Sequence, residues 1–210
     1  MIMSIIEKLA TSLGRKDDVP NQELAKEIAS ANNNNAVTEL INILKTTKDK
    51  KIQSDCIKTL YEIGYIKPEL ISEYYQFFIE LLESKNNRLV WGAMIALYTI
   101  STIKPKKVFE NLSKILEAID KGSVITKDYG VRILINLSAV SDIRNDAFAL
   151  LMEQLKKCEP KQLPMYAEKC LPIINEENKD VFIEILNDRF DELIKDSQKK
   201  RIEKVLKKLK

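Results

Sequence analysis

Side chains that commonly carry out chemistry are scarce in this sequence. No histidine occurs in the 210 residues, which removes His-based triads, His metal ligands and the usual acid–base group near neutral pH. The cysteines, Cys56, Cys158 and Cys170, are odd in number and form no CxxC pair, so neither a zinc knuckle nor a disulfide framework is expected. Reduced thiols are typical of the cytoplasm, which is the compartment we expect.

Motifs that bind phosphate, calcium or acyl groups are also missing from the sequence. Neither GxxxxGK(S/T) nor GxSxG occurs, and residues 176–180 (EENKD) lack the spacing of a calcium loop. We therefore expect no catalytic residue, no cofactor and no metal. The chain is predicted not to be an enzyme.

The formal charge of +3 is unevenly spread. Residues 195–210 (KDSQKKRIEKVLKKLK) hold eight Lys/Arg and two Asp/Glu, a net +6, so the rest of the chain carries −3. A nucleic-acid groove usually makes the body of a protein basic, which is not the case here. The longest apolar run, residues 89–100, is shorter than the roughly 20 residues of a membrane span, so no transmembrane segment is expected.

A repeat of 37 residues organises the middle of the sequence. Residues 58–68 (KTLYEIGYIKP) and 95–105 (IALYTISTIKP) share the pattern LYxIxxIKP. Further steps of 37 reach Leu134 and Leu171 in the same leucine column. Apolar residues spaced by three and four follow each of these segments, so each period predicts a first helix, a turn and a second amphipathic helix.

Local signals give the expected bounds of the elements. Pro68 and Pro105 mark the change from first to second helix, because proline is well tolerated in a first helical turn. Pro172 should kink or split the fourth first helix. Outside the regular repeats, further helices are predicted over residues 1–13, 21–31, 36–47, 179–195 and 197–209.

The LYxIxxIKP segments and the helix-pair period resemble HEAT and armadillo repeats, whose usual period is somewhat longer, about 40–47 residues. The resemblance covers about residues 21–195. It implies an all-α, right-handed α-α superhelical solenoid of about five antiparallel helix pairs, since one pair cannot bury its apolar face alone. We expect residues 1–210 to form one such domain, with 1–48 as cap and degenerate repeat, 49–196 as repeats and 197–210 as a basic terminal helix.

The resemblance also implies a concave face lined by the second helices. The helix expected over residues 70–83 carries a second apolar stripe beside its core face. That stripe and its equivalents in the next two repeats make up the predicted partner-binding set: Tyr74, Phe77, Leu81, Asn111, Lys114, Phe148 and Leu151. An exposed stripe of this kind would bind a partner helix or peptide, whereas a buried one would pack against the neighbouring repeat.

Three other features leave alternatives open. The basic C-terminal helix is suited either to an anionic membrane or nucleic acid, or to capping the array with its lysines in water. HEAT-like DNA glycosylases use aromatic and acidic groove residues, but Trp91 has no carboxylate within four residues, which favours a core or inter-repeat position. Asp128 and Arg132 have the spacing of a helical ion pair.

The sequence therefore predicts a non-catalytic scaffold or adaptor. We expect it to bind another protein or a peptide through the concave face of the solenoid. Nucleic-acid binding related to DNA repair is the alternative prediction.

Overall fold

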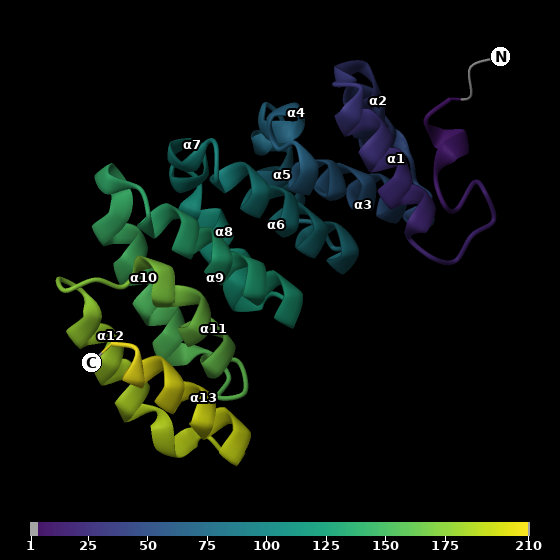
Figure 1. The fold of residues 1–210 in the computed structure, drawn as a ribbon. Helices are drawn as coiled ribbons and strands as arrows, with labels where there is room; N and C mark the ends of the chain where they lie inside the picture. Colours follow the sequence, from purple (N-terminus) through teal and green to yellow (C-terminus); the bar gives the residue numbers. More distant parts are fainter. Residues whose placement is uncertain (1–3, 210) are drawn as a thin grey trace. The chain divides into compact units, whose positions relative to one another are not determined.

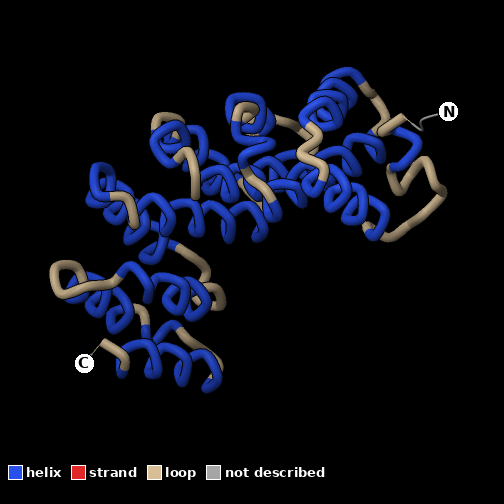
Figure 2. The backbone as a smooth tube through the Cα atoms, turned by 45° about the horizontal axis from the view of Figure 1, so that its top comes forward, coloured by secondary structure: helices blue, strands red, loops and turns tan. Residues whose placement is uncertain are grey.

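The computed structural model describes residues 4–209, and over that range it contains helices, turns and loops without any strand (Figures 1 and 2). This confirms the predicted all-α class. No helix in the described range is long and apolar enough to cross a membrane. The chain forms two compact units, which meet in the sequence between Gly130 and Val131. The single domain expected over 1–210 stays a prediction.

The first unit is built on two long helices, α3 and α6, which pack against each other. Helix α2 packs on α3, and α5 packs on α6. The elements of this unit are a 3₁₀ turn (Ile6–Lys8), α1 (Val19–Ser30), α2 (Asn34–Thr46), α3 (Lys50–Ile66), α4 (Glu69–Ser72), α5 (Tyr75–Leu81), α6 (Asn87–Ser101), α7 (Pro105–Phe109), α8 (Leu112–Lys121) and the first half of α9 (Val124–Ser138). Asp49 and Asn86 start the two long helices by accepting hydrogen bonds from their first backbone N–H groups.

Small residues let α3 and α6 approach closely. A Cβ atom on Gly92 of α6 would lie 2.5 Å from Cγ1 of Ile57 on α3. At the other end of the contact, Gly64 of α3 faces the side chain of Thr99 on α6. The fully buried Leu60 and Leu97, which share the predicted leucine column, belong to the apolar core of this unit.

The N-terminal helix predicted over residues 1–13 is wrong. Residues 1–3 lie outside the described range, and the remainder has only the 3₁₀ turn Ile6–Lys8 followed by turns. Side chains replace the helical bonds here: the Ala10 backbone N–H donates to Asn21 and that of Thr11 donates to Asp55. Asn21 in turn donates to Asp55 over 2.8 Å, which ties this segment to α1 and α3.

Two second helices of the first unit are each broken in two, which the periodicity did not predict. The helix expected over 70–83 is α4 and α5, and the equivalent one in the next repeat is α7 and α8. At the second break, the Asn111 amide donates to the Lys107 carbonyl, which occupies an acceptor at the end of α7. Each of these two repeats thus has one long helix, one short helix and one of medium length.

In the described part of the second unit, three 3₁₀ turns interrupt the run of helices. Its elements are the second half of α9, a 3₁₀ turn (Ser141–Ile143), α10 (Arg144–Lys157), α11 (Leu163–Cys170), a 3₁₀ turn (Leu171–Ile173), α12 (Lys179–Asp188), a 3₁₀ turn (Phe190–Glu192) and α13 (Asp196–Lys207). Helix α11 stops at Cys170 and Pro172 lies in the 3₁₀ turn that follows, so the predicted interruption by proline is confirmed. Helix α10 packs against α12, and α11 packs against α13.

The helix predicted over 179–195 ends early because of Arg189. This side chain is only 8% exposed, and its guanidinium donates over 2.6 Å to the backbone carbonyl of Leu155 on α10. It also contacts the sulfur of Cys158 and the carboxylate of Glu192. The carbonyl at the end of α10 therefore gains a charged donor, and the chain turns at Arg189 instead of continuing as a helix.

Candidate functional site

Three residues of the predicted partner-binding set, Tyr74, Phe77 and Leu81, belong to the first of the three repeats. Tyr74 and Phe77 are half-buried. The Tyr74 hydroxyl is 2.7 Å from that of Thr38 on α2, and the Phe77 ring lies under the amine of Lys45 at 5.1 Å. Leu81 is also half-buried. Tyr74 and Phe77 already have partners within the chain, and partner binding through the three residues stays a prediction.

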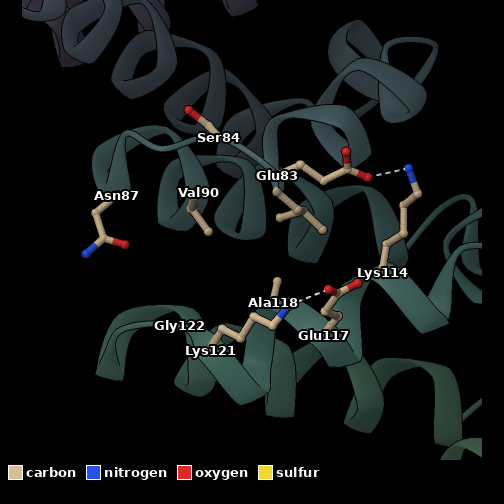
Figure 3. Close-up of a pocket in the computed structure, with 10 residues that line it drawn as sticks. Glu83, Ser84, Asn87, Val90, Lys114, Glu117, Ala118, Lys121 and Gly122 are labelled. Carbon is tan, nitrogen blue, oxygen red and sulfur yellow. Dashed lines mark hydrogen bonds and ion pairs between the residues drawn. The ribbon is translucent and has the colours of Figure 1, made fainter.

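Lys114 borders a polar pocket of about 340 Å³, which Figure 3 shows in close-up. Its amine lies 2.6 Å from the carboxylate of Glu83, and this hydrogen bond raises the pKa of Lys114. A second ion pair, Glu117 with Lys121 at 2.5 Å, lines the same pocket. Both carboxylates that line the pocket are therefore occupied by lysines of the chain itself.

The two members of the set in the second unit differ in exposure. Leu151 is completely buried, so its assignment as a partner contact was wrong: it is a core residue of α10. Phe148 is half-buried and lines a separate pocket of about 410 Å³ between α10 and α12, together with Met152 and Val181. The spacing by threes and fours could not separate these two positions, because both stripes of a helix are apolar when it packs on two sides.

Five aromatic rings that the prediction did not include form a continuous cluster in the first unit. We call this cluster the aromatic face; it consists of Tyr61 and Tyr65 on α3, Trp91 and Tyr98 on α6, and Tyr129 on α9. From Trp91 through Tyr61, Tyr65 and Tyr98 to Tyr129, successive ring centroids are 5.5–6.4 Å apart. At these distances tilted and edge-to-face pairs attract each other, so the rings hold one another in place.

The aromatic face has a buried base and open edges. Tyr61 is only 6% exposed and burial raises its pKa, although the neighbouring Lys58 acts in the opposite direction. Tyr65 is 45% exposed, and Trp91 and Tyr98 are half-buried. The hydroxyls of Tyr65 and Tyr129 are 2.6 Å apart, so one donates to the other across the cluster. A ligand would therefore meet rings whose positions are already fixed.

Charged groups flank the Trp91 end of the aromatic face. The Arg88 guanidinium lies 4.4 Å from the centre of the Trp91 ring, a cation–π distance. Lys58 is bonded to Glu62 at 2.7 Å, and Asp18 lies 3.7 Å from both cations. Burial lowers the pKa of Lys58, but its interactions with Glu62 and Tyr61 together outweigh burial and the pKa is raised overall. These charges are balanced, which leaves aromatic surface as the main feature of the site.

Part of this site was visible in the sequence. Tyr61 and Tyr98 occupy the same column of the 37-residue repeat, and a tyrosine repeated in an otherwise apolar column indicates a side chain whose hydroxyl reaches water. Tyr65, Trp91 and Tyr129 have no such column, because they come together only through packing of α3, α6 and α9.

Within residues 4–209, no group of three or more Cys, Asp or Glu side chains is placed to hold a metal ion.

Comparison with known proteins places the fold. No family model and no curated protein matches the sequence. Among solved structures, a designed armadillo repeat protein is similar with a TM-score of 0.62 at 13% identity, over 98% of both chains. An engineered protein of the Northeast Structural Genomics Consortium gives 0.61 at 18% identity, over 98% of this chain and 96% of its own.

A third set of similar structures carries a stated purpose. Computationally designed armadillo repeat proteins for modular peptide recognition give a TM-score of 0.52 at 14% identity, over 97% of both chains. Together these likenesses confirm the armadillo/HEAT-like helical repeat fold expected from the LYxIxxIKP segments.

Proposed function

We propose that this armadillo-like chain is a non-catalytic interaction scaffold that binds an extended segment of another protein across its aromatic face. One observation carries the proposal: five contiguous rings on three successive long helices, with a buried base and exposed edges. Rigid aromatic side chains provide large contact area at a low cost in conformational entropy, which is why they dominate binding sites for peptides and proteins.

The spacing of the helices suits an extended ligand. Packed helices lie about 8–10 Å apart, and an extended chain advances about 3.3 Å per residue. A segment crossing α3, α6 and α9 would thus place about every third residue over the same height of a new helix. Armadillo proteins designed for modular peptide recognition have the same type of fold, which supports a peptide ligand for this chain as well.

A peptide-display selection on the full chain tests the proposal. Peptides enriched on the wild-type protein are measured against the variant Tyr65→Ser with Tyr98→Ser, and against the matched variant Tyr74→Ser with Phe77→Ser. We expect at least about tenfold weaker binding for the first variant, as for truncated aromatic hot spots, and little change for the second. Loss of binding only in the second variant would move the site to the predicted stripe that contains Tyr74 and Phe77.

The nucleic-acid alternative is tested in the same series. Wild type and both variants are titrated with a single-stranded oligonucleotide at increasing salt. Binding that falls steeply with salt and survives loss of Tyr65 and Tyr98 would contradict the proposal and favour phosphate contacts. A selection that enriches no peptide at all would also contradict it.

A further inference from the structure

A basic pocket lies in the second unit, separate from the aromatic face in sequence and in the type of residue that forms it. Its volume is about 660 Å³. It is lined by Glu168 of α11, Leu171 of the following turn, Arg201, Lys204, Val205 and Lys207 of α13, and Lys208 directly after α13. Four cations thus surround one carboxylate and two apolar side chains.

The single carboxylate is already paired. Arg201 donates two hydrogen bonds to Glu168, at 2.7 and 2.6 Å, in the bidentate geometry of a guanidinium with a carboxylate. Among the described residues, no carboxylate forms an ion pair with Lys204, Lys207 or Lys208, and all three are exposed. The hydrogen bond from Arg201 lowers the pKa of Glu168, and Lys208 lowers it further. The field in the pocket is therefore positive.

The apolar face of α13 is not free to enter a membrane. Ile202 and Val205 are at most 1% exposed, and α13 packs against α11. A helix that lies in a bilayer surface needs this face for the acyl chains. The cations are therefore offered on a folded surface, beside the half-buried Leu171.

We infer that this pocket is a second binding site, which takes an acidic peptide segment that carries an apolar side chain beside its carboxylates. Arg201, Lys204 and Lys208 lie on one side of α13, and Lys204 and Lys208 are about 6 Å apart along the helix axis. Alternate side chains of an extended peptide are about 6.6 Å apart, so two carboxylates can meet both lysines. An apolar side chain two residues further along points to the same face of the peptide and contacts Leu171.

A short peptide suits this pocket better than a nucleic acid. Phosphate-driven binding needs a basic track that follows several successive phosphates. Here the excess positive charge lies in residues 195–210, whereas the other residues together carry −3. A pocket with an apolar floor and a few lysines matches carboxylates that accompany apolar side chains.

The test uses the full chain and a short fluorescein-labelled peptide of Glu, Leu and Phe, measured by fluorescence anisotropy. The variant Lys204→Glu with Lys208→Glu reverses two charges in the pocket. The control variant Lys161→Glu with Lys195→Glu makes the same change in net charge next to the N-termini of α11 and α13, where carboxylates are favourable. We expect at least about tenfold weaker binding for the pocket variant and less than about twofold for the control.

A neutralising variant, Lys204→Gln with Lys208→Gln, keeps the test valid if charge reversal near the end of α13 unfolds the helix. It should also weaken binding, with an unchanged circular dichroism spectrum. Equal weakening in the control would reduce the effect to net charge and overturn the site. Binding of phosphatidylserine vesicles or a single-stranded oligonucleotide without binding of the acidic peptide would overturn the choice of ligand.

Discussion

Both units have an apolar core, but they differ in what else brings their helices together. In the first unit, α3 and α6 meet through apolar side chains and through glycines such as Gly92, which brings the α6 backbone against Ile57. In the second unit, a buried charged side chain, Arg189, connects the turn after α12 to the end of α10. Apolar packing repeats along the sequence because each repeat buries the same face. A single polar connection does not repeat, and the second unit is correspondingly irregular.

The two units should differ most in the free energy of unfolding that is lost when a leucine of the same repeat column is removed. Leu97 is completely buried between helices of the first unit, and its removal by Leu97→Ala should cost about 2–5 kcal/mol in the free energy of unfolding. Leu171 occupies the same column, but it is half-buried in a 3₁₀ turn. Leu171→Ala should therefore cost roughly 1 kcal/mol or less, because less apolar surface is lost.

Urea unfolding of both variants measures this difference. Equal losses would mean that the column is buried alike in both units. The regular and the irregular unit would then not differ in how they bury the leucine column.

Arg189→Met tests the polar connection of the second unit. The substitution keeps an apolar stem but removes the donor to the Leu155 carbonyl, and we expect a loss of about 2–3 kcal/mol, since hydrogen bonds from a charged group are involved. Arg201→Met is the matched control. Its bidentate pair with Glu168 is similar in geometry but about 40% exposed on both sides, so its loss should cost roughly 0–1 kcal/mol. Thermal unfolding of both variants compares the two directly, and a similar loss for both would refute the special role of Arg189.

The same contrast explains what could be predicted from the sequence. The period of 37 and the leucine column predicted the helices of the first unit because burial there follows the helical spacing. Arg189 gave no such signal, since its partner Leu155 is 34 residues away and the bond is made to a backbone carbonyl. The N-terminal segment was misjudged for the same reason: Asn21 and Asp55 bond to its backbone from distant helices.

The residues of the candidate site also differ in whether the sequence could predict them. The shared column of Tyr61 and Tyr98 was open to prediction, whereas the joining of Tyr65 with Tyr129 depends on the packing of helices 64 residues apart in sequence. Leu151 is a residue that the sequence wrongly assigned to the site. Spacing placed it on a binding stripe, but a helix covered on two sides buries both of its apolar stripes.

Gly92→Ala should have a smaller effect. The added Cβ would lie 2.5 Å from Ile57, and overpacking of this kind costs about 1–3 kcal/mol. Alanine recovers up to about 1 kcal/mol of helix propensity, so the net loss should be about 1 kcal/mol. In the background Ile57→Ala, the same substitution should cost nothing or stabilise, because the space is then free. A double-mutant cycle without coupling would show that α3 and α6 do not depend on this close approach.

Tyr65→Phe should have the smallest effect on stability and says most about the aromatic face. The substitution removes the hydroxyl bond to Tyr129 but keeps the ring, and Tyr65 is 45% exposed, so the cost should be about 0.5 kcal/mol. Peptide affinity should stay within about twofold of the wild type if the ring edges supply the contact area, whereas Tyr65→Ser should weaken it clearly. An equal loss of affinity in both variants would mean that the hydroxyl pair itself recognises the ligand. The aromatic face would then be a polar site, closer in character to the basic pocket of the second unit than the packing of its rings suggests.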